Sequence, residues 1–127
     1  MKRSLMLIVI TALISCTSCS KEDSKEKELV NKWHLIESLS DPGDGSGVFV
    51  KIESDAIMEF YDNNSLVFTE NLCINGTSYT GTYSLLKNKI YPECAQEAAL
   101  NFRIENNHLI INYNCIEACA EKFELIE

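Results

Sequence analysis

From residue 33 to the C-terminus, apolar and polar residues alternate with a period of two. This alternation is the pattern of half-buried β-strands. The segments are short, and pairs such as Asn63-Asn64, Asn75-Gly76 and Asn106-Asn107 separate them with residues that favour tight turns. We therefore expect an antiparallel meander with strands at 33–38, 48–52, 56–61, 66–70, 78–85, 89–91, 100–105, 108–113 and 122–126.

A meander of about eight short strands can form a sandwich or a closed up-and-down barrel. Closure removes the exposed strand edges that promote aggregation, so we predict an all-β, antiparallel, eight-stranded up-and-down barrel. The interior of such a barrel is filled by side chains or holds one small ligand. Trp33, the only tryptophan, opens the first strand, and we expect its indole to close one end of the core.

The composition limits the chain to one domain and restricts its partners. The sequence has 127 residues and a net charge of −8. Loss of an export segment removes Lys2 and Arg3 and no acid, which brings the charge of the mature chain to about −10. Such a charge repels nucleic-acid phosphates and anionic lipid surfaces. We therefore expect no nucleic-acid binding, and membrane attachment through a covalent lipid.

The N-terminus has the features of a secretory signal. Two basic residues precede an apolar run at residues 5–14, and small residues and cysteines follow it. Ten helical residues extend only ~15 Å, about half of the hydrocarbon core, so the run is too short to span a bilayer. It predicts a signal peptide and not a permanent transmembrane helix.

Two cysteines follow small residues in a way that resembles the bacterial lipobox, in which the cysteine is acylated. Leu13 fits the usual aliphatic position and favours Cys16. Cys19 is followed by Ser-Lys-Glu-Asp, which resembles the export signal of surface-exposed lipoproteins in Bacteroidetes-type bacteria. We predict lipidation at Cys19, with Cys16 as the alternative and plain cleavage to a secreted protein as the other outcome. The expected location is the outer membrane, at the cell surface, with the periplasmic face as the alternative.

Residues 20–28 contain no apolar residue, so they cannot join a core. We expect a solvated tether there, ending in one helical turn in which Leu29 and Val30 pack under the barrel. The predicted organisation is a lipoprotein signal peptide at 1–18, a lipidated acidic tether at 19–30 and the barrel domain at 31–127.

The mature domain contains four cysteines, and an even number in an exported chain indicates disulfides. Three connectivities are possible. The spacing of Cys115 and Cys119 within one connection makes that pair geometrically easy, and we predict it together with Cys73–Cys94. A Cys₄ zinc site and a redox pair are weaker alternatives, because the spacing departs from paired C-x2-C motifs. We expect no metal and no cofactor.

Several stretches together resemble a known family. They are Trp-His-Leu-Ile-Glu at 33–37, Asp-Pro-Gly-Asp-Gly-Ser-Gly at 41–47, Met-Glu-Phe at 58–60, Leu-Cys at 72–73, Gly-Thr-Tyr at 81–83, and the cysteine-framed segment 115–123. The chain is similar over nearly the whole mature domain to the small lipocalin-like lipoproteins of Bacteroidetes-type bacteria. The resemblance implies a lipid-anchored, lipocalin-type barrel and says little about a ligand.

Lipocalins open with Gly-x-Trp, and this sequence has Asn31 in the glycine position. The resemblance also implies a cation stacked on Trp33, which would close the bottom of the barrel. Lys122 on the last predicted strand is the first candidate for that cation, and Arg103 is its rival.

No motif indicates catalysis, because the sequence lacks a nucleophile elbow, a spaced triad and an H-E-x-x-H motif. We therefore expect a protein that is not an enzyme. His34 and His108 are expected at surface or satisfied polar positions, and Glu59 is expected to face solvent. The 41–47 loop departs from the EF-hand pattern, so an ordered, lid-like loop over the barrel mouth is favoured over a calcium site.

Together these features indicate a binding protein. The first hypothesis is a small apolar ligand at the barrel mouth, under the 41–47 loop, lined by Phe60, Phe68, Tyr83 and Phe102. The alternative is a filled barrel that acts as an interaction or inhibitor module toward an envelope protein. Ligand binding ranks first only by analogy with the architecture.

Overall fold

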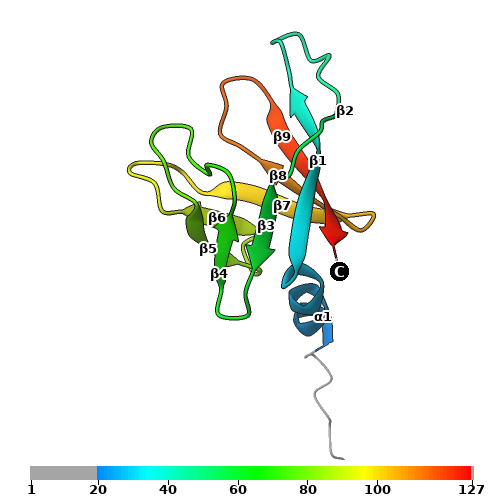
Figure 1. Cartoon of the computed structure of the whole chain (residues 1–127), viewed down its shortest axis with the longest axis vertical. Helices are drawn as coiled ribbons and strands as arrows, with labels where there is room; N and C mark the ends of the chain where they lie inside the picture. The colour runs from blue at the N-terminus through cyan, green and yellow to red at the C-terminus, as the bar shows by residue number, and fades with distance from the viewer. Residues whose placement is uncertain (1–19, 127) are drawn as a thin grey trace, which may run out of the picture.

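The computed structural model describes residues 20–126, with side chains from Asp23 onward (Figure 1). The predicted signal peptide and both candidate lipidation cysteines lie outside these residues. In chain order the elements are α1 (Ser20–Leu29), β1 (Lys32–Ser40), β2 (Val50–Lys51), β3 (Ile57–Phe60), β4 (Ser65–Phe68), β5 (Thr80–Ser84), β6 (Lys89–Pro92), β7 (Leu100–Glu105), β8 (His108–Asn112) and β9 (Cys119–Ile126). Within residues 20–126, no helix has the length and apolar character needed to cross a membrane.

The strands form a closed, eight-stranded antiparallel barrel, as predicted. From β3 to β9 each strand pairs with the next one in the chain, and β1 closes the ring by pairing with both β3 and β9. The short β2 lies beside the far end of β1, where Val50 and Lys51 pair with Ser38 and Glu37. Each predicted segment overlaps one of these strands.

The asparagines in the connections explain why the strands reverse so tightly. Asn64, Asn88, Asn106 and Asn107 have φ between 50° and 63°, a left-handed conformation that asparagine tolerates better than most residues. Gly76 has a φ of 107°, in the turn predicted at Asn75-Gly76. The local sequence therefore sets where each strand ends.

Large aromatic side chains fill the interior of the barrel. Phe60 makes an edge contact with Tyr83, with ring centroids 5.2 Å apart, and a tilted contact with Phe102 at 6.4 Å. Phe68 packs edge-on against Phe123 at 5.8 Å. All five rings belong to one continuous buried cluster. Burial of each such side chain contributes roughly 1.5 to 3 kcal/mol, so this cluster is the main stabilising element of the fold.

The segment expected to be a solvated tether is helical from Ser20 to Leu29. Lysine and glutamate have high helix propensity, and Asp23 precedes Lys27 by four residues, a spacing that places opposite charges side by side on a helix. Asp23, Lys25 and Lys27 are exposed, as the polar composition requires, whereas Leu29 is fully buried beneath the barrel. The helix therefore docks on the barrel through its last residue.

Trp33 and Asn31 hold the C-terminal end of α1 against the barrel. The indole N–H of Trp33 donates to the carbonyl oxygen of Leu29 at 3.0 Å, and the whole side chain is buried. The Asn31 amide donates to the carbonyls of Lys27 (3.0 Å) and Glu28 (3.1 Å). These carbonyls lack partners within the helix, so both side chains act as caps. Asn31 thus has a structural role as a cap for the C-terminus of α1.

The predicted stacking of Lys122 on Trp33 is wrong. The register pairs Trp33 with Leu125, and Lys122 with Glu37 further up the barrel. The ammonium of Lys122 forms an ion pair with Glu37 and lies 4.4 Å from the centroid of the Phe49 ring. The rival cation, Arg103, pairs instead with Glu105 at 3.1 Å, in an exposed position. Trp33 is satisfied by a backbone carbonyl and needs no cation.

We predict that Trp33→Phe lowers the free energy of unfolding by about 2 to 3 kcal/mol. The substitution removes the buried hydrogen bond from the indole to the Leu29 carbonyl, which then keeps only the bond from the Asn31 amide, and it creates a small cavity. Denaturant titration followed by circular dichroism measures this change without the tryptophan signal. Tyr91→Phe on the outer wall, where Tyr91 is 38% exposed, is the control and should change the value by less than about 0.5 kcal/mol. Equal effects of the two substitutions would contradict the proposed role of the indole.

A candidate binding site at the barrel mouth

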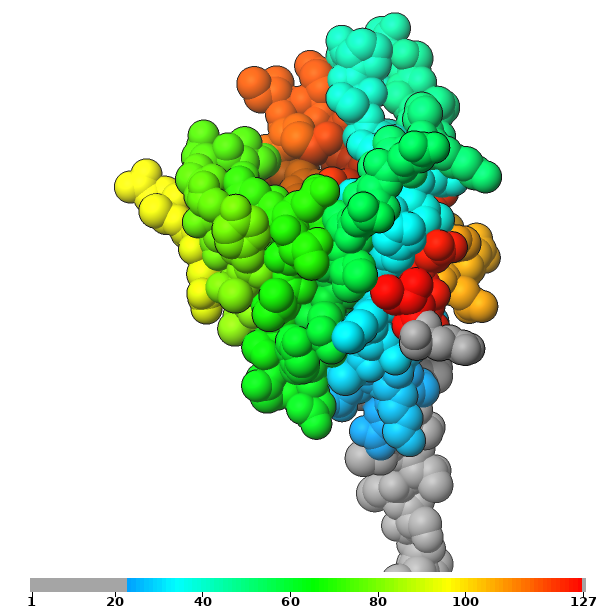
Figure 2. Space-filling view, in the orientation of Figure 1, coloured from blue at the N-terminus to red at the C-terminus, as the bar shows by residue number. Residues whose placement is uncertain are grey.

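The end of the barrel opposite α1 is formed by four connections, at residues 41–49, 69–79, 93–99 and 113–118, and we call it the mouth (Figure 1). Figure 2 shows the 41–49 and 113–118 connections next to each other at this end of the molecule. The opposite end is covered in part by α1, and hollows remain between the helix and the strand connections there, bordered by Phe60, Tyr83 and Phe102 among others. Within residues 20–126 the mouth is the end that no helix covers.

Both predicted disulfides form, and both lie at the mouth. Cys73–Cys94 joins the 69–79 and 93–99 connections, and Cys115–Cys119 closes the 113–118 connection on itself. In the chain-entropy model such bridges stabilise by roughly 3 and 2 kcal/mol respectively. Cysteines in disulfides offer no thiolates, so they do not form the alternative Cys₄ zinc site. Cys73, Cys94 and Glu97 lie close enough together for a metal site, but the disulfide leaves the two cysteines without thiolates to coordinate a metal.

Polar contacts join the mouth connections to one another. The carboxylate of Glu97 accepts from the Ile74 amide at 2.9 and 3.0 Å, and Asn114 donates to the Ala98 carbonyl at 3.0 Å. Asn71 organises its own connection, because its amide oxygen accepts from the backbone N–H of both Cys73 and Ser78. The mouth is therefore a rim of cross-linked loops.

The glycine-rich 41–47 loop is held closed by its first residue. The carboxylate of Asp41 accepts from the amides of Gly43 (2.7 Å), Gly45 (3.1 Å) and Gly47 (2.8 Å). These bonds, the one from Gly47 foremost, lower the pKa of Asp41. A Cβ at position 47 would lie 2.8 Å from Asp41 Oδ2, so the close approach requires glycine. The Asp41 oxygens are thus occupied by backbone donors, an arrangement that fits an ordered loop better than a calcium site.

The loop is also tied to its neighbour. The Asp41 amide donates to the Ala118 carbonyl at 2.8 Å, which joins the 41–47 loop to the disulfide-closed connection. A Cβ at Gly43 would lie 3.4 Å from the Glu117 carboxylate, so the two connections are in close contact.

A β-bulge directs polar side chains into the mouth. The pairing of β1 with β9 shifts between Leu35 and Glu37, so one residue of β1 is left over at this point. Beyond the bulge Glu37 pairs with the outward Lys122, and Ser38 pairs with Glu121, which lies on the same face of β9 as the fully buried Phe123. Without the bulge, Glu37 would face inward.

The mouth contains a cavity of about 290 Å³, with Ser38, Ser40, Asn71, Leu72, Tyr113 and Glu121 in its lining. The hydroxyl of Tyr113 donates to Glu121 Oε2 at 2.5 Å. Burial raises the pKa of Glu121, and the nearby charge of Glu70 raises it further, although the bond from Tyr113 acts in the opposite direction. Burial, followed by the charge of Glu121, raises the pKa of Tyr113. A largely buried carboxyl group therefore lines an open cavity.

The residues predicted from the sequence fall in different places. Phe60, Phe68, Tyr83 and Phe102 come together, but in the packed core, where each is at most 5% exposed. Glu59 lies on the outer wall, paired with Lys32 at 3.7 Å, as expected.

Sequence reasoning missed Tyr113 and Glu121. The signal was present for Glu121, because it precedes Phe123 by two residues and therefore shares its face of the strand. It went unused because the last strand was predicted to begin only at residue 122.

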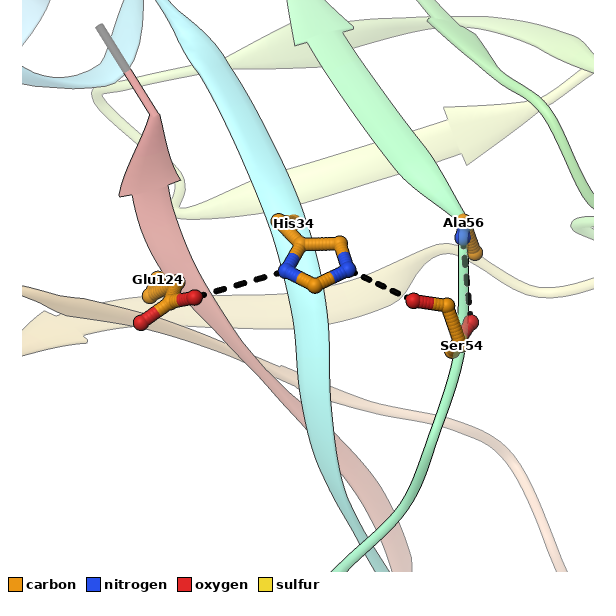
Figure 3. A network of polar contacts seen from close by, with 4 residues as sticks. All are labelled: His34, Ser54, Ala56 and Glu124. Atoms are coloured by element: carbon orange, nitrogen blue, oxygen red, sulfur yellow. Dashed lines mark hydrogen bonds and ion pairs between the residues drawn. The ribbon is translucent and has the colours of Figure 1, made fainter.

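His34 lies on the outer wall and connects three segments (Figure 3). Its Nε2 is 2.6 Å from the Ser54 carbonyl, in the connection between β2 and β3, and its Nδ1 is 3.3 Å from Glu124 on β9. Both partner atoms are acceptors, so only the doubly protonated ring donates to both. The bond to Ser54, and then the bond to Glu124, raise the pKa of His34 above 6.5. His34 and His108, which bonds the Asn106 carbonyl at 2.9 Å, are both satisfied polar residues.

No protein-family model, curated protein or solved structure matches this chain significantly.

We predict that His34 makes the stability of the protein depend on pH. Because the pKa of His34 is raised in the folded state, its stabilisation is complete below the unfolded value and is lost as pH rises through the folded value. The difference in free energy of unfolding between wild type and His34→Gln should therefore be larger near about pH 5.5 than near about pH 8.5. Denaturant titrations of both proteins at these pH values measure it. A constant difference would show that the ring is not charged in the fold.

Proposed function

We propose that this protein is a lipid-anchored, non-catalytic binding module of the cell envelope, which holds a protein partner at its barrel mouth. Membership of the small lipocalin-like lipoproteins is part of this proposal and rests on the sequence motifs. The observation that carries it is the contrast between the two ends of the barrel. One end is covered by α1, and the other is a disulfide-stapled rim.

The anchor would orient the barrel with its mouth away from the membrane. Lipidation at Cys19 would place the acyl chains directly before Ser20, the first residue of α1. The helix lies against this end of the barrel, so the lipid would be next to the end that α1 covers. The mouth lies at the end opposite α1 (Figure 1), so its rim would face the aqueous side, where a soluble or envelope partner can reach it.

The packed core favours binding at the mouth over binding inside the barrel. The four aromatic side chains expected to line an apolar ligand site belong to the buried cluster, and Phe60 contacts both Tyr83 and Phe102. An apolar ligand in this position would have to separate these rings, with the loss of their mutual packing. For this reason the proposal does not include an apolar ligand inside the barrel.

The rim has apolar side chains that a protein partner could bury. Ile116 is fully exposed at the tip of the Cys115–Cys119 connection, and Ile74 is 49% exposed next to Cys73. Single exposed aliphatic residues are common on protein surfaces. These two, however, are held by disulfides, so burying them costs little conformational entropy. A rigid, partly apolar rim around a polar cavity is a suitable surface for protein recognition.

Site-specific photo-cross-linking in intact cells tests the proposal. A photoreactive phenylalanine at Ile116 should give one reproducible adduct with an envelope protein, identified by mass spectrometry. Leu86 is the matched control, because it is an equally aliphatic, 80% exposed residue beside the hollow that Asp23 and Glu26 of α1 help to line. The probe at Leu86 should not give the same adduct. No adduct from Ile116, or the same adduct from both positions, would contradict binding at the mouth.

The same strains test the anchor. Cys19→Ser should release the protein from the membrane fraction and abolish the adduct from Ile116, whereas Cys16→Ser should leave both unchanged. Retention of Cys19→Ser in the membrane fraction, with release of Cys16→Ser, would move the lipid to the alternative cysteine.

A further inference from the structure

The mouth cavity is small and open to solvent. Its volume of about 290 Å³ is just below the usual range for drug-sized ligands, so it suits a single side chain or a small group. The ring of Tyr113 and the side chain of Leu72 give it apolar walls, whereas Ser38 and Glu121 give it polar groups. A ligand group that fits such a space has a short apolar stem and a polar head.

One oxygen of Glu121 has no partner in the described part of the chain. Oε2 accepts the hydroxyl of Tyr113, and Oε1 accepts no hydrogen bond. No buried side-chain nitrogen or oxygen in residues 23–126 is left without a partner, so Oε1 must be reached by solvent. The cavity that Glu121 lines is the open space through which solvent reaches it. The carboxylate therefore offers one free oxygen to the cavity.

The cations of the chain that could neutralise Glu121 are used elsewhere. Its strand neighbour Lys122 is on the outer face, in an ion pair with Glu37. Lys32 pairs with Glu59, and Arg103 pairs with Glu105. The acid Glu70 acts on Glu121 as a like charge. A largely buried carboxylate without a counter-charge is costly to a fold, and it is therefore a feature that a cationic ligand would satisfy.

From this geometry we propose that the mouth cavity binds a cationic group, an alkylammonium or a guanidinium, with Glu121 Oε1 as its acceptor. The inference rests on the proposed function and adds the chemistry of the partner group. A lysine or arginine side chain has the required form, because its alkyl stem packs along apolar walls and its head forms charge-assisted hydrogen bonds to a carboxylate. Tyr113 would hold the carboxylate in place through its bond to Oε2.

An NMR titration of the ¹⁵N-labelled full-length protein tests this inference. The probes are butylammonium and butylguanidinium, with butanol as the neutral control and butyrate as the anionic control. Both cations should shift the amide signals of Tyr113 and Glu121 saturably, and neither control should. Capped lysine, with both its α-amino and carboxyl groups blocked as amides, forms a second arm. Binding of capped lysine assigns the site to a protein side chain, whereas binding of butylammonium alone assigns it to a small free amine.

Two substitutions provide the matched comparison. Glu121→Gln keeps the shape and the acceptor for Tyr113 but removes the charge, so it should weaken cation binding by at least about tenfold. Glu124→Gln is on the same strand but on the opposite face, and it should change binding by less than about twofold. Because Glu121→Gln removes a poorly solvated charge, it should remain folded, which circular dichroism verifies.

Absence of saturable shifts with both cations, or equal affinities of wild type and Glu121→Gln, would overturn the inference. The photo-cross-link from Ile116 shows whether a negative result concerns only the cation site or also the proposed binding of a protein partner. A persistent adduct without cation binding would reject the cationic subsite alone. Cation binding without any adduct would reject the protein partner and leave a small amine as the ligand.

Discussion

The hydrogen bond from the Trp33 indole to the Leu29 carbonyl is the contact that gives this barrel two different ends. It fastens the C-terminus of α1 beneath the first strand, where Leu29 and Trp33 are both fully buried. The interior of an eight-stranded barrel is lined by side chains, and apolar ones at its ends need to be covered from water. With α1 in place, one end of the barrel is covered by a helix and the other is formed by connections alone.

Along β9 the inward face changes from apolar to polar. Phe123 is fully buried in the core, and Glu121, two residues earlier on the same face, lines the mouth cavity. The bulge near Ile36 makes the change possible, because it turns Glu37 outward to meet Lys122 and places Ser38 opposite Glu121. The burial that raises the pKa of Glu121 is a cost to the fold. Costs of this kind are typical of groups that serve binding and not stability.

Much of the fold could be predicted because its signals are local. The period-two alternation located every strand, the asparagine turns located several of the reversals, and export together with spacing gave both disulfides. The bulge could not be predicted, since no residue type near Ile36 marks it. Lys122 was assigned to Trp33 by the family resemblance, whereas the register pairs Trp33 with Leu125. Only the last turn of the helix was predicted, with Leu29 under the barrel, because the polar residues before it give no sign of a buried face.

The site was predicted less well than the fold. The aromatic residues were placed correctly inside the barrel, but whether they line a space or fill it depends on their mutual packing, which alternation does not report. Tyr113 directly follows β8 and Glu121 lies on β9, and only the register of β8 with β9 brings them within hydrogen-bond distance. The mouth is thus a product of tertiary structure, while the barrel wall is largely a product of local sequence.

The central claim is that the barrel interior is filled and that binding occurs at the mouth. Native mass spectrometry of the protein purified from its own envelope in mild detergent tests it most directly. We expect the mass of the mature chain with its lipid and two disulfides, and no apolar molecule released on denaturation. A stoichiometric apolar molecule that is lost when the barrel unfolds would show that the interior is not filled and that the aromatic cluster is a ligand site.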